Sequence, residues 1–149
     1  MLKVSRTTSD NKDFKNLLDE LNNDLRARYS NNEYKFDIDI RIDHLETVAL
    51  AYINDITLGC GCFKEIKDDT VEIKRMFVNP YFRGYGVASA ILEELTTWAK
   101  ELYYSWAVLE TGEQQPESIK LYSKHGFEII NNFGPYVGVK GSICMGKRL

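Results

Sequence analysis

The residues best suited to chemistry lie in a short glycine-containing turn between a predicted strand and a predicted helix. Gly84 and Gly86 lack a Cβ, so the backbone can turn sharply there and approach a bound group closely. The first amides of the following helix have no internal partner, and together with the helix dipole they attract anions. The pattern predicts a site that suits a diphosphate, formed by Arg83, Gly84, Tyr85, Gly86, Val87 and Ala88. A simple strand-to-helix turn would need the same glycines, because a single Gly-x-Gly is a weak signal.

Two familiar nucleotide-binding patterns do not match this turn. A phosphate-binding P-loop carries Gly-Lys-Ser/Thr at the start of its helix, and this chain has no such residues there. A dinucleotide fold places its glycines after the first strand of a parallel βαβ unit. Here the turn follows a predicted hairpin, late in the chain, so neither architecture is expected.

Cysteine and histidine are too scattered for a metal site or a disulfide framework. The three cysteines, Cys60, Cys62 and Cys144, are odd in number and irregularly spaced. The two histidines, His44 and His125, show no ligand spacing with them. We therefore predict buried thiols, no metal and no acyl-cysteine intermediate.

Length and charge indicate a small soluble protein. The 149 residues, of which 44% are hydrophobic, suit a single domain over 1–149. The net charge is −3, without blocks of like charge, whereas phosphate-rich partners favour a basic surface. No apolar run approaches the ~20 residues that cross a bilayer, and the N-terminus has no apolar signal-peptide core. We expect a cytoplasmic chain that binds neither nucleic acid nor membranes.

Apolar spacing and turn residues predict the elements that would position the turn. A strand at 2–7 precedes a helix whose apolar residues at 14, 17, 18, 21 and 25 have helical spacing. Strands at 48–53 and 57–66 form a predicted antiparallel hairpin, and a strand at 70–79 leads into the turn. A helix, a strand at 106–110, a helix at 116–124 and strands at 127–130 and 142–147 follow, while 29–43 is a short helix or a loop. This order indicates a mixed α/β (α+β) domain, with a mostly antiparallel sheet and helices on both faces.

Two segments, in their sequence, order and separation along the chain, resemble motifs A and B of the GCN5-related N-acetyltransferase (GNAT) superfamily. The turn at 83–88 satisfies the motif A pattern Gln/Arg-x-x-Gly-x-Gly/Ala. The segment from Pro116 to Phe127 looks like motif B, with Tyr122 at its tyrosine position. The order of elements matches as well, so the resemblance covers essentially the whole chain. It implies a GNAT-like sheet with a splayed central strand pair, and transfer of an acetyl group from acetyl-CoA to an amine in a ternary complex.

The resemblance also implies which residues hold acetyl-CoA. The turn would bind the diphosphate through its amides, while the strand before it, Met76, Phe77 and Val78, would pair with the pantetheine arm. A main-chain amide near Met76 would stabilise the developing oxyanion. Gln115 and Ser118 stand where motif B usually has asparagine and alanine, so particular coenzyme contacts would differ here.

Three side chains are candidate catalysts under this resemblance. Tyr122 would protonate the leaving thiolate, although a helix tyrosine can also simply pack against a sheet. Glu72 alternates with Val71 and Ile73, so it faces away from them and could accept the proton of the attacking ammonium. Glu110 is the second candidate base, or a group that binds the substrate ammonium. Each carboxylate could instead be a solvated strand residue.

The acceptor amine is the least determined partner. Candidate lining residues are Tyr34, Phe36, His44 and Tyr136, and the acidic residues Asp37, Asp39 and Asp43 with Glu110 point to a cationic acceptor. A small amine or an amino acid fits, and a protein lysine or N-terminus stays open. Two other functions also stay open: a silent acyl-CoA-binding regulatory module, and an interaction domain with an empty cleft. A homodimer is compatible with the resemblance.

Overall fold

The computed structural model describes residues 1–28 and 44–149. Within them a seven-stranded sheet has the order β1-β2-β3-β4-β5-β7-β6. The elements are β1 (Leu2–Thr7), α1 (Lys12–Arg28), β2 (Val48–Ile53), β3 (Ile56–Lys67), β4 (Thr70–Val78), α2 (Val87–Glu101), β5 (Trp106–Gly112), α3 (Pro116–Lys124), β6 (Glu128–Ile130) and β7 (Ser142–Arg148). Short 3₁₀ turns cover Pro80–Phe82 and Gly134–Tyr136. The predicted mixed, mostly antiparallel fold is confirmed.

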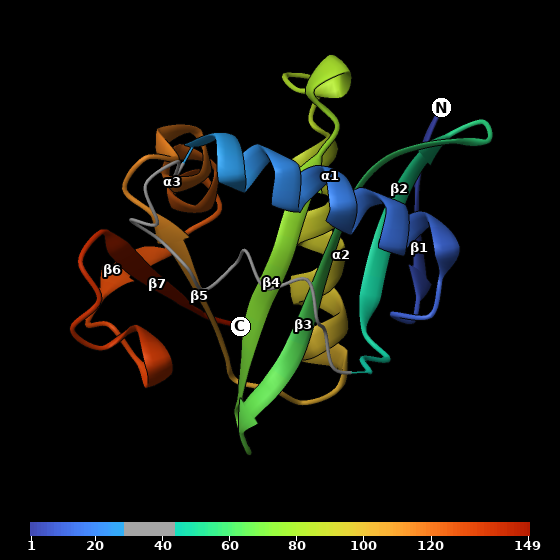
Figure 1. The fold of residues 1–149 in the computed structure, drawn as a ribbon. Helices are drawn as coiled ribbons and strands as arrows, with labels where there is room; N and C mark the ends of the chain where they lie inside the picture. Colours follow the sequence, from blue (N-terminus) through green and yellow to red (C-terminus); the bar gives the residue numbers. More distant parts are fainter. Residues whose placement is uncertain (29–43) are drawn as a thin grey trace.

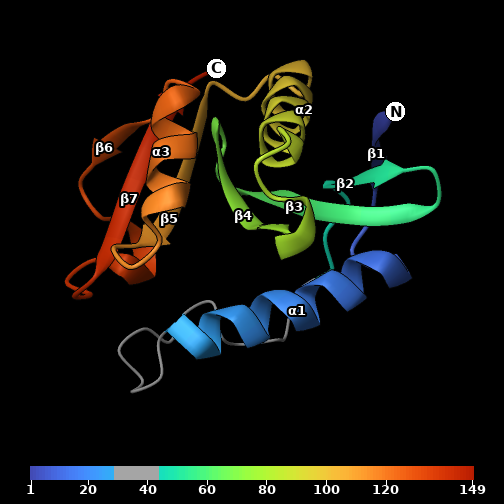
Figure 2. The same ribbon diagram turned by 90° about the horizontal axis from the view of Figure 1, so that it is seen from above.

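The helices α1 and α2 lie on opposite faces of the sheet (Figures 1 and 2). In β2 the side chains alternate, so that Val48 and Leu50 pack beneath α1 whereas Ala49 and Ala51 face α2. Each face therefore has its own apolar core. The core under α1 includes the apolar residues predicted from helical spacing, namely Phe14, Leu17, Leu18, Leu21 and Leu25.

Local signals explain where the helices begin and end. The Asn11 side chain accepts hydrogen bonds from the amides of Asp13 (2.8 Å) and Phe14 (3.3 Å), which caps α1. Pro116 occupies the first position of α3, where its missing amide hydrogen costs nothing. Gly126 follows that helix with φ +87°.

A bulge in β4 marks the centre of the sheet. Cys60 pairs with Phe77 and Cys62 with Lys74, so one residue of β3 faces two residues of β4. Arg75 takes a φ of +58° within this bulge. Because a bulge bends its strand and increases its twist, the end of β4 can turn away from its next neighbour.

That neighbour, β5, runs parallel to β4 and separates from it partway along. Thr70–Ile73 pair with Trp106–Leu109, after which the register between the two strands ends. The other pairs of neighbouring strands described are antiparallel. The splayed central pair implied by the resemblance is thus present. Among the described residues, no helix is long and apolar enough to span a membrane.

Candidate active site

The gap between β4 and β5 opens where their pairing stops. Ile73 and Leu109 are the last paired residues. Beyond them β4 continues to pair with β3 through Phe77 and Val78, and β5 continues to pair with β7. Figure 2 shows the two strands diverging from this point. The backbone edge of β4 that faces the gap can therefore accept an extended molecule as an added strand.

A groove of about 410 Å³ runs from this gap to the start of α2. Its walls are the end of β4, the glycine-containing turn, the first residues of α2, one side of α3 and the C-terminal part of α1. It brings together most residues that the sequence suggested for coenzyme binding: Met76, Phe77, Val78, Arg83, Gly84, Gly86, Val87, Ala88, Gln115 and Ser118. Tyr85 was predicted with them, but its side chain is 79% exposed and does not line the groove described.

The turn holds its shape through two glycines and one arginine. Gly84 and Gly86 have φ angles of +86° and +82°, which cost other residues about 1–2 kcal/mol each. A Cβ at either position would meet no atom within 4 Å, so the space in front of the turn is open. Arg83 folds back, because its Nε donates to the Val78 carbonyl (2.8 Å) and its guanidinium lies 5.4 Å from the Phe77 ring. A braced turn, a helix N-terminus and an elongated groove together fit a diphosphate-bearing group such as coenzyme A.

One ion-pair cluster ties α1 to α3 at the mouth of the groove. The Arg28 guanidinium contacts the carboxylates of Asp24 (Nε–Oδ2 3.3 Å) and Glu117, and it donates to the Gln114 carbonyl (3.3 Å). Arg28, Asp24 and Glu117 all line the groove. The Arg83 guanidinium also lies 3.9 Å from Asp24 (Nη2–Oδ2), so two arginines balance the two carboxylates in this part of the groove.

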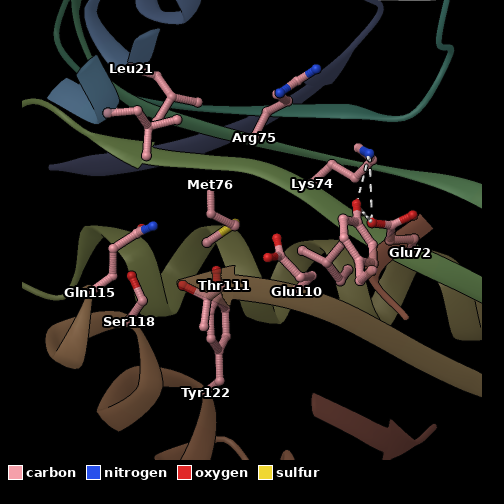
Figure 3. A pocket seen from close by; sticks show the side chains of 13 residues that line it. Leu21, Glu72, Lys74, Arg75, Met76, Glu110, Thr111, Gln115, Ser118 and Tyr122 are labelled. Atoms are coloured by element: carbon pink, nitrogen blue, oxygen red, sulfur yellow. Dashed lines mark hydrogen bonds and ion pairs between the residues drawn. The ribbon is translucent and has the colours of Figure 1, made fainter. Parts of the chain in front are cut away.

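Tyr122 lies at the junction of the groove with a smaller inner cavity. It is 6% exposed, and its ring packs edge-on against Phe127 with 5.9 Å between ring centroids. Figure 3 shows its side chain extending from α3 toward Thr111 and Met76. Tyr122, Met76, Gln115 and Ser118 line both cavities. The phenol thus lies where the groove meets the gap between the strands.

The inner cavity also contains both predicted carboxylates. Glu72 accepts a hydrogen bond from the Tyr136 hydroxyl at 2.7 Å, and its Oε2 lies 3.6 Å from the Lys74 Nζ. The same lysine nitrogen donates to the Tyr136 hydroxyl at 3.4 Å. The Glu72 side chain is only 7% exposed, so this is a nearly buried carboxylate held by a phenol and an ammonium. The three candidate catalysts therefore line one cavity, of about 50 Å³.

Glu110 is the first residue of β5 beyond its last pair with β4. Its Oε2 accepts a hydrogen bond from the Ser142 hydroxyl of β7 at 2.7 Å. In the view of Figure 3 its carboxylate lies between Tyr122 and the pair of Glu72 and Lys74. Glu110 can therefore reach a group held at the gap from the side opposite to β4.

A third cavity, here called the sheet-face pocket, lies beside the inner cavity and has a volume of about 590 Å³. Its lining comes from β3, β4 and β5, from the end of β6 and from the 3₁₀ turn that carries Tyr136. It shares Glu72, Lys74 and Tyr136 with the inner cavity. The groove, the inner cavity and the sheet-face pocket therefore form a series in which the candidate catalysts occupy the middle.

The predicted acceptor residues fare differently from one another. Tyr136 lines both the inner cavity and the sheet-face pocket. His44 lies beside Asp10 near the start of α1 (Nδ1–Oδ2 3.6 Å), is 56% exposed, and lines none of the three cavities described. Tyr34, Phe36, Asp37, Asp39 and Asp43 lie outside the described residues.

Sequence reasoning missed Lys74 and Trp106 as lining residues of these cavities. Alternation along β4 places Lys74 on the face of Glu72, which was a usable signal. The position of Trp106 depends on the register of β4 with β5, where Thr70 pairs with Trp106, and local pattern does not give that register.

The cysteines are buried, as predicted, and line none of these cavities. Burial raises the pKa of Cys62 to about 12 and that of Cys60 well above its ordinary range. Burial also raises the pKa of Cys144. Since only a thiolate is a good nucleophile or metal ligand, none of them is activated. Among the described residues, no cluster of metal-binding side chains is present.

Solved acetyltransferase structures have the same fold. A Streptococcus agalactiae 2603 acetyltransferase matches 99% of this chain and 98% of its own, with TM-score 0.74 and 21% identity. A GNAT family acetyltransferase from Elizabethkingia anophelis, solved with acetyl-CoA bound, matches 99% and 98%, with TM-score 0.71 and 20% identity. The architecture built around the splayed strands is therefore shared with proteins of this class.

The sequence comparison identifies the family. The profile of the acetyltransferase (GNAT) family matches residues 13–127, and the chain belongs to that family. An IAA acetyltransferase of Azospirillum brasilense is 38% identical over 93 residues, which are 62% of this chain and 61% of that protein. The chain spans 24–33% of the length of the other curated relatives that it matches.

Proposed function

We propose that this protein transfers the acetyl group of acetyl-CoA to the primary amine of a small molecule or an amino acid. The observation that carries the proposal is the series of three cavities with Tyr122, Glu72 and Glu110 in the middle one. A ternary-complex transfer needs two substrates that reach one point from separate sides. Alignment of two bound reactants can supply effective molarities of up to ~10⁵–10⁸ M.

The groove would hold acetyl-CoA, which supplies the thioester that the amine attacks. The amides at the start of α2 would bind the diphosphate, and the open edge of β4 would pair with the pantetheine arm. A β4 amide near Met76 would donate to the thioester oxygen as negative charge develops on it. The phosphate end of acetyl-CoA would then lie near the Arg28 cluster, at the mouth of the groove.

Glu72 and Glu110 are the two groups that could take the proton of the attacking amine. Glu72 is held rigidly by Tyr136 and Lys74, whereas Glu110 lies across the gap on β5. When the carbon–sulfur bond breaks, Tyr122 would donate its phenolic proton to the leaving thiolate. The net result is an amide, free coenzyme A and one proton, so no metal or redox partner is required.

The test combines binding with turnover. Calorimetric titration with acetyl-CoA measures occupancy of the groove, and thiol release with a panel of amines measures transfer. We expect Tyr122→Phe to keep the affinity for acetyl-CoA and to lower kcat by about 10²–10⁴-fold. Tyr103→Phe is the matched control, because Tyr103 is 92% exposed and lines none of the three cavities.

Two results would contradict the proposal. Absence of heat with acetyl-CoA would indicate an interaction domain with an empty cleft. Binding of acetyl-CoA without thiol release for any amine would indicate a silent acyl-CoA-binding module.

A further inference from the structure

The lining of the sheet-face pocket is mainly apolar and partly aromatic. The apolar side chains that line it are Ile66, Trp106, Val108, Ile130, Phe133 and Pro135. Trp106 is 41% exposed and Ile130 is 37% exposed, although both are large hydrophobic residues. Phe133 is fixed by an edge-on contact with Tyr136, with 5.3 Å between ring centroids. The pocket thus offers rigid apolar surface to a bound group.

This apolar surface begins where the acceptor amine would react. Glu72, Lys74 and Tyr136 line both the sheet-face pocket and the inner cavity, so the two cavities adjoin at these side chains. The sheet-face pocket shares none of its described lining residues with the coenzyme groove. An amine placed against the candidate catalytic carboxylates would therefore extend its body into the sheet-face pocket, away from the coenzyme.

The charges around the pocket disfavour a second cation. Lys64, Lys67 and Lys74 line it, against two carboxylates, Asp69 and Glu72. Asp69 already accepts a hydrogen bond from the Thr70 hydroxyl (2.8 Å), and Glu72 is held by Lys74 and a phenol. A second ammonium on the acceptor would meet more lysine than acid there, and like charges repel.

We propose that the sheet-face pocket binds the body of the acceptor, and that the acceptor is a primary monoamine with an apolar group the size of an aromatic ring. This inference rests on the proposed function. A pocket of about 590 Å³ is large enough to bury such a group. Differences of one methylene in apolar pockets change kcat/KM by roughly 10–200-fold, so a whole ring has a measurable effect.

The first experiment compares three amines at saturating acetyl-CoA. We expect kcat/KM for 2-phenylethylamine to exceed that for ethanolamine and for 1,4-diaminobutane by at least about tenfold. Ethanolamine lacks the apolar body, and the diamine replaces it with a second cation. Equal values for the three amines, or a preference for the diamine, would overturn the inference while leaving acetyl transfer itself intact.

A second experiment uses a matched pair of neighbours on β6. Ile130 lines the pocket, whereas Ile129 is 69% exposed and does not. We expect Ile130→Ser to raise KM for 2-phenylethylamine by about three- to tenfold, because the substitution removes apolar surface that the bound ring would cover, with KM for acetyl-CoA unchanged. Ile129→Ser should change neither value. Equal effects of the two substitutions would contradict a specific pocket.

A third readout does not need turnover. The chain has two tryptophans, Trp98 and Trp106, so a Trp98→Phe protein reports on Trp106 alone. We expect 2-phenylethylamine to change the Trp106 fluorescence saturably, and 1,4-diaminobutane to have no such effect. A saturable signal without thiol release would support the pocket but contradict the proposed function. No signal and no preference among the amines would overturn the inference.

Discussion

The hydrogen bond between Tyr136 and Glu72 is the interaction whose removal we can predict most closely. It joins the 3₁₀ turn before β7 to the first part of β4 at 2.7 Å, between residues that are 2% and 6% exposed. Tyr136→Phe removes the hydroxyl and keeps the ring, including its contact with Phe133. The Glu72 carboxylate then loses a donor at a site that water reaches poorly.

The expected cost follows from the charge on the acceptor. A buried hydrogen bond to a charged group contributes about 1.5–3 kcal/mol, against about 0.5–1.5 kcal/mol for a neutral one. Tyr136→Phe should therefore lower the free energy of unfolding by about 1.5–3 kcal/mol. For a chain of this length that is a fall in Tm of roughly 3–12 °C. In a Glu72→Gln background the same change should cost about 1 kcal/mol less, because the acceptor is neutral.

A double-mutant cycle by guanidinium denaturation measures this difference. Tyr103→Phe again serves as the control and should leave stability unchanged. KM for acetyl-CoA should stay constant in Tyr136→Phe, because Tyr136 does not line the groove that we propose to hold acetyl-CoA. The reasoning is refuted if Tyr136→Phe costs under 0.5 kcal/mol, or if it costs the same with Glu72 and with Gln at that position.

Three further changes test other parts of the site. Gly86→Ala should lower stability by about 1–2 kcal/mol in denaturation, because φ is +82° and no atom obstructs a Cβ; unchanged stability would contradict the required turn. Because burial raises the pKa of Cys62 to about 12, this thiol should resist a thiol reagent at pH 8 until guanidinium unfolds the chain; rapid labelling of the native protein would argue against burial. The folded state keeps the thiol protonated, so the protein should lose stability as the pH rises from about 9 toward 12. Arg28→Ala should cost under about 1 kcal/mol of stability, but the carboxylates left at the groove mouth should weaken acetyl-CoA binding at low salt. An unchanged Kd at low salt would show that Arg28 does not compensate those charges.

Local sequence predicted the individual helices and strands because each has its own apolar periodicity or its own capping and turn residues. The helical spacing from Phe14 to Leu25 and the bounds of α3 from Pro116 to Lys124 agree with the structure. The strands and the turn with Gly84 and Gly86 agree as well, since alternation, turn residues and glycine act over a few neighbours. The interpretation of that turn as an anion site also rests on local features, namely the glycines and the unpaired amides at the start of the following helix.

The assembly of the site was decided by tertiary structure. Tyr136 reaches Glu72 across 64 residues of chain, and the groove, inner cavity and sheet-face pocket each draw on strands or helices distant in sequence. The register between β4 and β5, the residue at which they part, and the pairing of Trp106 with Thr70 depend on packing two cores on one sheet. His44 shows that local sequence does not place a side chain in a site. A histidine suited an acceptor site, but the chain brings His44 next to Asp10, near the start of α1. The sequence alone therefore determined which elements form and where the glycine-containing turn lies. The folded chain determined which side chains meet, because such contacts depend on long-range packing that no short pattern encodes.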